Sequence, residues 1–224
     1  TNGELEGVAL IGHSTLVEAR TDDAMYALAV VARHADTPIH LIMSNGKAAE
    51  AFWKYFSSSA SSPRLKCIEE LFELSFPFLV KKCKWEVRYA TLNELEQVAE
   101  AQAEVALLES GVDPMIRDRK GFLKRVARRI EQDRVFVVVE DGELIFKADV
   151  VAQTDDVAYL EGVYVSPEHR GKGIGPECLA EVGLRLLNEV QNVCLLSNVD
   201  FGNAHASFLK AGFRNTDHCT TLFV

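Results

Sequence analysis

The chain has 224 residues, of which 48% are hydrophobic and 25% charged, as is ordinary for a globular protein. A net charge of −9, carried mostly after residue 84, argues against general nucleic-acid binding and suits either a cationic acceptor such as an amine or a simple role in solubility. No apolar run is long enough to span a membrane, no secretory signal is visible, and five scattered cysteines and six isolated histidines show no metal-ligand spacing, so we expect a cytoplasmic protein without a metal.

Residues 1–84 are predicted to form a small N-terminal α/β domain. Strands are expected at 8–11 and 39–43, and helices at 22–33 and 47–56. Ser44-Asn45-Gly46-Lys47, before the second helix, could suggest a phosphate site. A helix cap is the favoured interpretation, because an isolated Gly-Lys pair is common. We place the domain boundary near Lys81–Lys84.

The first part of residues 85–224 is predicted to be helical. Thr91 and Glu94 form a capping box, and the apolar spacing after it indicates a helix that ends at 111–114. A second helix is expected from about 117 to 131. Its polar face could bind phosphate or an acidic partner, although a solvated face is favoured. The cations on that face are Arg117, Arg119, Lys120, Lys124, Arg125, Arg128 and Arg129.

The rest of the chain reads mainly as strands. Asp141-Gly142 is a strong hairpin signal between strands at 135–140 and 143–153, and a further strand at 157–165 follows. The chain then enters a glycine-rich loop at 170–175 and a helix that ends near Asn188. The last expected elements are a strand at 193–198, a helix at 204–210 and a strand at 216–224.

The glycine-rich loop has the pattern of an anion-binding site. It reads Arg170-Gly171-Lys172-Gly173-Ile174-Gly175 and connects a strand to a helix. Glycines let the main chain approach a phosphate closely, and the N–H groups at a helix start favour an anion. Pro176 has no N–H, but it fits the first turn of a helix. The spacing is that of neither a Walker-type loop nor a dinucleotide fingerprint.

This loop resembles the acyl-CoA loop of the GCN5-related N-acetyltransferases (GNAT). Arg170, Gly173 and Gly175 match the family pattern of Gln or Arg, two residues, Gly, one residue, then Gly or Ala. The segment from Ala204 to Phe213 resembles a second family motif. The resemblance covers residues 85–224 and implies the GNAT fold: an α/β (α+β) domain whose central mixed, mostly antiparallel sheet is flanked by helices. Residues 1–84 would be an additional α/β domain, or a degenerate half of the same fold.

The resemblance also implies where acetyl-CoA binds. The strand before the loop would pair with pantetheine, the loop would hold the pyrophosphate, and the acyl group would lie where the next strand splays away. The cofactor-binding residues so implied are Val163, Tyr164, Val165, Arg170, Gly171, Lys172, Gly173, Ile174, Gly175, Asn198, Asn203 and Phe208. The expected partners are acetyl-CoA, a small amine and, in a homodimer, a second copy of the chain; neither nucleic acid nor a membrane is expected.

The catalytic assignment rests on two positions. Glu161 lies in the strand expected to face the thioester and could accept the amine proton, or could only bind a cationic substrate. Apolar neighbours are expected to bury it and raise its pKa. The family's Tyr that protonates the thiolate falls at Phe208, which cannot donate a proton. The alternative function is therefore an acyl-CoA-binding regulatory module with little or no catalysis.

Overall fold

The computed structural model describes residues 3–57, 61–76 and 82–224. The chain forms two compact units. Unit 1 consists of residues 1–70 together with 217–224, and unit 2 consists of residues 71–216. Compactness thus divides the chain at two points rather than at a single boundary near residue 84. The division into domains 1–84 and 85–224 stays a prediction. Lys81, the first residue of the predicted boundary, lies outside the described residues.

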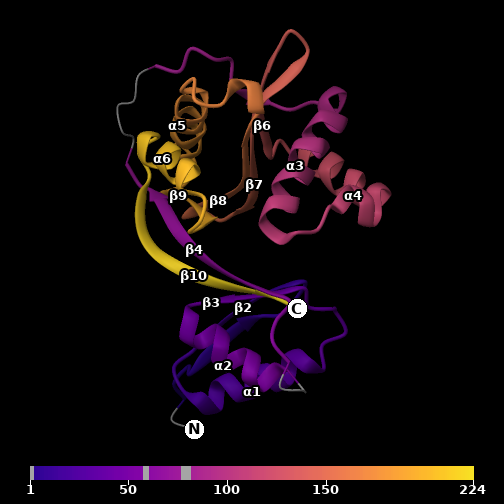
Figure 1. The fold of residues 1–224 in the computed structure, drawn as a ribbon. Helices are drawn as coiled ribbons and strands as arrows, with labels where there is room; N and C mark the ends of the chain where they lie inside the picture. The colour runs from indigo at the N-terminus through magenta and orange to yellow at the C-terminus, as the bar shows by residue number, and fades with distance from the viewer. Residues whose placement is uncertain (1–2, 58–60, 77–81) are drawn as a thin grey trace. The chain divides into compact units, whose positions relative to one another are not determined.

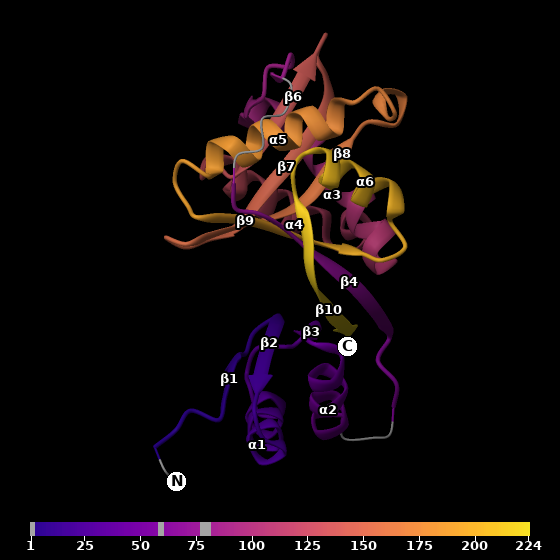
Figure 2. The same cartoon turned by 90° about the vertical axis from the view of Figure 1, so that its left-hand side faces the viewer.

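Unit 1 is a sheet with two helices on one face, α1 and α2 (Figures 1 and 2). Strands β1 and β2 are antiparallel, β2 and β3 are parallel, and β10 pairs antiparallel with β3. The buried core lies between sheet and helices and includes Val17, Ile42, Phe52 and Leu222. The bounds are β1 Gly7–Leu10, β2 Ser14–Ala19, α1 Asp22–Arg33, β3 Leu41–Ser44 and α2 Gly46–Phe56, and the end of β10 completes the unit.

Unit 2 has three layers, with a mixed sheet in the middle. Helices α3 and α4 cover one face and α5 and α6 the other (Figure 1). The strand order is β4-β9-β8-β7-β6-β5, and neighbours from β5 to β8 are antiparallel whereas β8 and β9 are parallel. The mixed, mostly antiparallel sheet flanked by helices is the fold expected from the sequence.

The elements of unit 2 follow the expected order, with two additional strands. Those strands, β4 and β5, carry weak sequence signals, and β4 and β10 each run from one unit into the other. The bounds are β4 Leu65–Leu74, β5 Arg88–Tyr89, α3 Leu95–Ser110, α4 Pro114–Glu131, β6 Val135–Glu140, β7 Glu143–Gln153, β8 Val157–Val165, α5 Ile174–Leu186, β9 Asn192–Asn198, α6 Gly202–Lys210 and β10 Arg214–Phe223.

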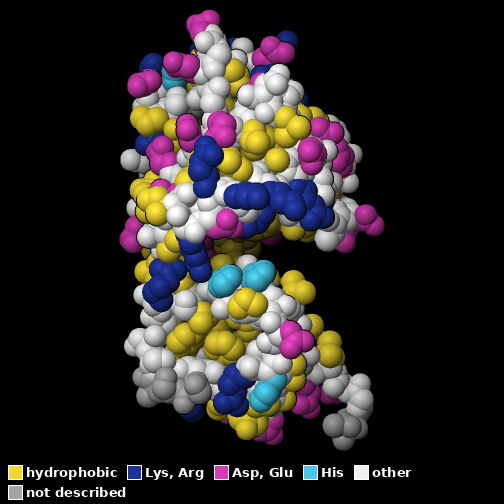
Figure 3. All heavy atoms as spheres, turned by 90° about the vertical axis from the view of Figure 1, so that its right-hand side faces the viewer, with side chains coloured by type: hydrophobic (Ala, Val, Ile, Leu, Met, Phe, Trp, Pro, Cys, Tyr) yellow, Lys and Arg dark blue, Asp and Glu magenta, His cyan; other side chains and the backbone are white. Residues whose placement is uncertain are grey.

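Helix α4 presents a basic face. It begins at Pro114, because the Asp113 side chain accepts a hydrogen bond from the Met115 N–H, and it buries Phe122, Val126 and Ile130 as predicted. Figure 3 shows a band of Lys and Arg side chains on unit 2, and six of the seven predicted α4 cations are exposed. Arg129 is the exception, since it reaches a buried carboxylate.

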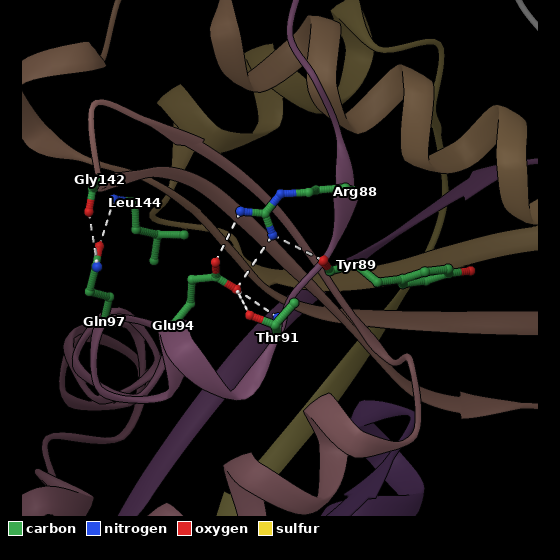
Figure 4. A network of polar contacts seen from close by, with 7 residues as sticks. All are labelled: Arg88, Tyr89, Thr91, Glu94, Gln97, Gly142 and Leu144. Atoms are coloured by element: carbon green, nitrogen blue, oxygen red, sulfur yellow. Dashed lines mark hydrogen bonds and ion pairs between the residues drawn. The ribbon is translucent and has the colours of Figure 1, made fainter.

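Helix α3 is fixed at its N-terminal end by two sets of polar contacts (Figure 4). In the predicted capping box, Glu94 accepts hydrogen bonds from the Thr91 N–H at 2.6 Å and from its hydroxyl at 2.8 Å, and Glu94 also pairs with Arg88. Gln97 accepts from the Leu144 N–H and donates to the Gly142 carbonyl of the β6–β7 hairpin. These contacts fix the first turn of α3 against the β6–β7 hairpin and the segment before the helix.

Candidate active site

The glycine-rich loop lies between β8 and α5, where the sequence places it. Gly173 is the N-cap of α5 with φ +83°, a left-handed conformation that residues with a side chain rarely adopt. No side chain caps this helix. The Ile174 and Gly175 N–H groups therefore have no partner within the helix, Pro176 has no N–H, and the Glu177 N–H bonds the Gly173 carbonyl. The start of α5 thus offers backbone donors and the positive end of a helix dipole.

Arg170 is bound to the protein itself. Its Nε donates to the Val165 carbonyl at 2.9 Å, and its Nη2 pairs with Glu104 of α3 at 2.9 Å. The Tyr164 hydroxyl donates to the other Glu104 oxygen at 3.3 Å, and burial raises the pKa of Tyr164. Arg170 therefore ties the loop to β8 and α3, while Lys172 is exposed beside the glycines.

Strands β8 and β9 pair over only part of their length. Their parallel register runs from Val157 opposite Asn192 to Leu160 opposite Leu195 and ends there, although both strands continue. Beyond this point β8 pairs with β7 alone, so the β8 edge at residues 161–165 is not hydrogen-bonded to β9. The expected splay between the two strands is present, directly before the glycine-rich loop.

Glu161 lies at the start of this unpaired edge. It is opposite Asp149 of β7 in the antiparallel register. Its side chain is exposed, so the expected burial, on which a raised pKa was based, is wrong. The reason is local: Glu161 lies between the buried residues Leu160 and Gly162, and successive side chains of a strand point to opposite faces, so burial of its neighbours does not bury Glu161.

The other expected cofactor-binding residues fall into two groups. Val163 and Val165 are half-buried against the core that α5 covers, and Gly175 approaches Val165 so closely that an added Cβ would lie 3.3 Å from its Cγ2. Asn198 accepts a hydrogen bond from the Asp200 N–H in the β9–α6 turn, and Asn203 is exposed in α6. The assignment of these residues to acetyl-CoA stays a prediction.

Phe208 lies in the core of unit 2. Its side chain is 5% exposed and packs edge-on against Phe72, with ring centroids 5.3 Å apart. The phenyl ring contributes no proton donor here. Contact between this ring and a bound thioester stays a prediction.

A buried polar cluster that no sequence motif revealed lies under β8. Lys147 of β7 is fully buried, and its Nζ lies 2.5 Å from Gln102 Oε1, 2.8 Å from Asp149 Oδ1 and 3.0 Å from the Gly162 carbonyl. Asp149, 2% exposed, also pairs with Arg129 at 2.6 Å. Burial lowers the pKa of Lys147, and the Asp149 carboxylate opposes this. A Lys and an Asp two residues apart in a mostly apolar strand lie on the same face, and this pattern could have indicated a buried ion pair.

Cys178 and Cys194 of unit 2 are unsuited to nucleophilic chemistry at neutral pH. Burial raises the pKa of the Cys178 thiol strongly and that of Cys194 to about 11, so both remain protonated. Within the described ranges 3–57, 61–76 and 82–224, no three His, Cys, Asp or Glu side chains come together to hold a metal ion. None of the helices described there is long and apolar enough to cross a membrane.

Comparison with known proteins gives a family match within unit 2. Residues 131–215, from the end of α4 to the start of β10, match the model of the acetyltransferase (GNAT) domain. No protein with a curated description matches the sequence.

Solved structures show the same fold over most of the chain. A GNAT-family acetyltransferase from Colwellia psychrerythraea has a TM-score of 0.62 and 12% identity, over 100% of this chain and 82% of its own. An acetyltransferase of the GNAT family from Novosphingobium aromaticivorans has a TM-score of 0.58 and 15% identity, over 92% of this chain and 82% of its own. A tandem GNAT protein from the clavulanic acid biosynthesis pathway has a TM-score of 0.56 and 16% identity, over 100% of this chain and 80% of its own. Residues 131–215 thus match the GNAT acetyltransferase domain, and solved GNAT structures share the fold, in agreement with the resemblance of the glycine-rich loop.

Proposed function

We propose that this chain transfers an acetyl group from acetyl-CoA to a small amine. One observation carries the proposal: the β8 edge that β9 leaves unpaired leads directly into the uncapped N-terminus of α5. A free strand edge can bond the amides of pantetheine, and a helix start with open N–H groups can hold a pyrophosphate. Both features lie within residues 161–175.

The reaction would need few protein groups. The amine nitrogen attacks the thioester carbonyl, a C–N bond forms, and the C–S bond breaks as the tetrahedral intermediate collapses. Glu161, exposed at the start of the free edge, would accept the amine proton directly or through water. The departing thiolate would take its proton from water, because Phe208 has none to give. In this scheme the protein accepts the amine proton through Glu161, and the solvent supplies the proton to the thiolate.

Acetyl transfer is tested by measuring CoA release with acetyl-CoA and a mixed library of amines. The variant is Glu161→Gln, and the matched control is Glu168→Gln, which makes the same change at an exposed position outside the free edge. If Glu161 is the base, its variant should lose about 10²–10⁴-fold in turnover and keep its acetyl-CoA affinity. If Glu161 only binds a cationic amine, mainly KM for the amine should rise. Wild-type values for both constants would remove Glu161 from the site.

The alternative is a regulatory module that binds acyl-CoA without transferring the acyl group. Phe208 at the position of the family's proton donor supports it. Acetyl-CoA binding without CoA release in the presence of the amines would favour this alternative, and absence of acetyl-CoA binding would contradict both.

A further inference from the structure

The cluster around Lys147 occupies an irregular point of the sheet. Lys147 is opposite Tyr164 and Asp149 is opposite Glu161, so β8 uses three steps where β7 uses two. The additional residue on β8 forms a β-bulge that includes Gly162, with φ +59°. A Cβ on Gly162 would lie 2.3 Å from Gln102 Oε1 and 2.7 Å from Lys147 Nζ. The missing side chain is what gives Lys147 access to the strand.

Lys147 has three oxygen partners in this position. Its ammonium group forms an ion pair with Asp149 Oδ1 of β7, and it donates hydrogen bonds to Gln102 Oε1 of α3 and to the Gly162 carbonyl of β8. The third oxygen, the Gly162 carbonyl, belongs to the bulge itself. Lys147 therefore joins helix α3 to the point at which β8 turns toward the glycine-rich loop.

Stability alone gives little reason for such a group. Removing charges from water is costly, and replacing a buried ion pair by apolar side chains of similar size is often neutral or stabilising. The neighbouring positions of β7 are buried and apolar, so an apolar side chain would suit this environment. What an apolar residue could not supply is a donor to the Gly162 carbonyl.

We propose that Lys147 is a positioning residue of the acyl-CoA site: by bonding the Gly162 carbonyl it holds the β8 bulge and so directs the backbone of residues 163–165 at pantetheine. The proposal rests on the proposed function for its ligand. Asp149 and Gln102 hold the ammonium group in place, and Asp149 is itself held by its ion pair with Arg129.

The first measurement is hydrogen–deuterium exchange on the free protein, and it does not depend on a ligand. Lys147→Met keeps the length and apolar character of the side chain and removes the donor. Amides of residues 163–165 should exchange about tenfold or more faster, whereas those of 157–160, which pair with β9, should keep wild-type rates. Lys124→Met, the same change on the exposed face of α4, is the control and should alter neither. Unchanged exchange at 163–165, or equal acceleration along all of β8, would overturn the proposal.

The second measurement is calorimetry with two ligands. Acetyl-CoA carries pantetheine, and adenosine 3′-phosphate 5′-diphosphate carries the pyrophosphate without it. Lys147→Met should weaken acetyl-CoA binding by about tenfold and leave the nucleotide within about twofold. Equal losses for both ligands, or none for acetyl-CoA, would contradict a positioning role. If the wild-type protein binds neither ligand, the proposed function fails and the ligand assignment with it, and exchange alone then decides whether Lys147 holds the bulge.

A second variant with a smaller structural change keeps the proposal testable if Lys147→Met does not fold. Asp149→Asn keeps the size of the side chain and weakens the anchor of the ammonium group without removing it. It should produce the same pattern of exchange and ligand discrimination with a smaller amplitude. Wild-type behaviour of a folded Asp149→Asn protein would show that the contact to Gly162 does not depend on this cluster.

Discussion

Each unit contains a strand whose connection leads into a helix, and the first turns of these two helices are capped differently. In unit 1, β3 leads into α2, and the Asn45 side chain accepts a hydrogen bond from the Ala48 N–H at 3.0 Å. In unit 2, β8 leads into α5, and Gly173 at the N-cap supplies no side chain. The first helix start has one of its donors capped by a side chain, whereas the second has no side-chain cap.

The difference shows why a Gly-Lys pair at a helix start is not by itself an anion site. Gly46-Lys47 follows Asn45, whose amide oxygen occupies the place that a phosphate oxygen would take. Gly173 has a left-handed backbone conformation and no side chain, so no side-chain oxygen lies over the first N–H groups of α5. The predicted cap at Asn45 is confirmed. Substitutions at the two helix starts test whether they differ in function.

The largest effect is expected from separating unit 1 from its last strand. Residues 220–223 of β10 pair with β3, and Leu222 is buried in the core of unit 1. A fragment of residues 1–84 lacks both and should show no cooperative thermal unfolding by circular dichroism. Joining residues 1–70 to 217–224 through a short Gly/Ser linker should restore a transition. Dispersed amide shifts and cooperative unfolding of the 1–84 fragment would contradict the prediction.

The next effect concerns the two glycine turns. Gly173→Val places a β-branched residue at φ +83°, which is strained by roughly 1–2 kcal/mol or more, and Gly175→Val crowds Val165. Each should weaken acetyl-CoA binding by about 10–100-fold in calorimetry. Gly46→Val is the matched control at the first residue of α2, where an added Cβ also meets an atom at 3.3 Å. It should leave acetyl-CoA affinity within about twofold, and equal losses in both units would refute the distinction.

A smaller effect is expected at Asn45. Asn45→Ala removes the cap of α2 and should lower the free energy of unfolding by about 1 kcal/mol, as measured by urea denaturation. Asn45→Asp keeps a side-chain oxygen and should retain most of that stability. Neither variant should alter acetyl-CoA affinity, because the cap serves only the helix. A clear loss of affinity in Asn45→Ala would show that the β3–α2 turn takes part in binding.

The smallest effect concerns Glu69, whose carboxyl accepts a hydrogen bond from the Thr221 hydroxyl within unit 1. Burial raises the pKa of Glu69, and the hydrogen bond partly opposes this. The folded state therefore holds the proton more tightly, so this stabilising contribution is present below the unfolded pKa and is lost as pH rises through the folded value. Glu69→Gln should flatten this part of the stability–pH curve and be relatively more stable at neutral pH. Glu18→Gln, an exposed control on β2, should leave the curve unchanged.

Much of the fold could be predicted because its signals are local. The capping box at Thr91, the hairpin turn at Asp141-Gly142 and the glycine-rich loop each depend on a few neighbouring residues, and all three are present. The family resemblance followed from the same local patterns. Strands β2, β4 and β5 escaped prediction, because the pairing of a strand depends on partners that lie far away in the sequence.

The candidate site divides in the same way. Local sequence patterns were enough to predict the strand, the glycine-rich loop and the following helix, and to single out Glu161 and Phe208. Only the tertiary structure decided that Glu161 is exposed, that Arg170 is held by Glu104 and that β8 separates from β9 after Leu160.

The buried cluster of Lys147 and the entry of β10 into unit 1 were likewise decided only in three dimensions. Lys147 contacts Gln102 and Gly162, which lie 45 residues before it and 15 after it in the chain, and β10 joins a strand from the first 50 residues. Such pairings depend on which surfaces meet once the chain has collapsed, and the free energy that selects them comes from burial summed over many residues. Local propensity fixes how each segment can fold, and long-range burial fixes which segments meet.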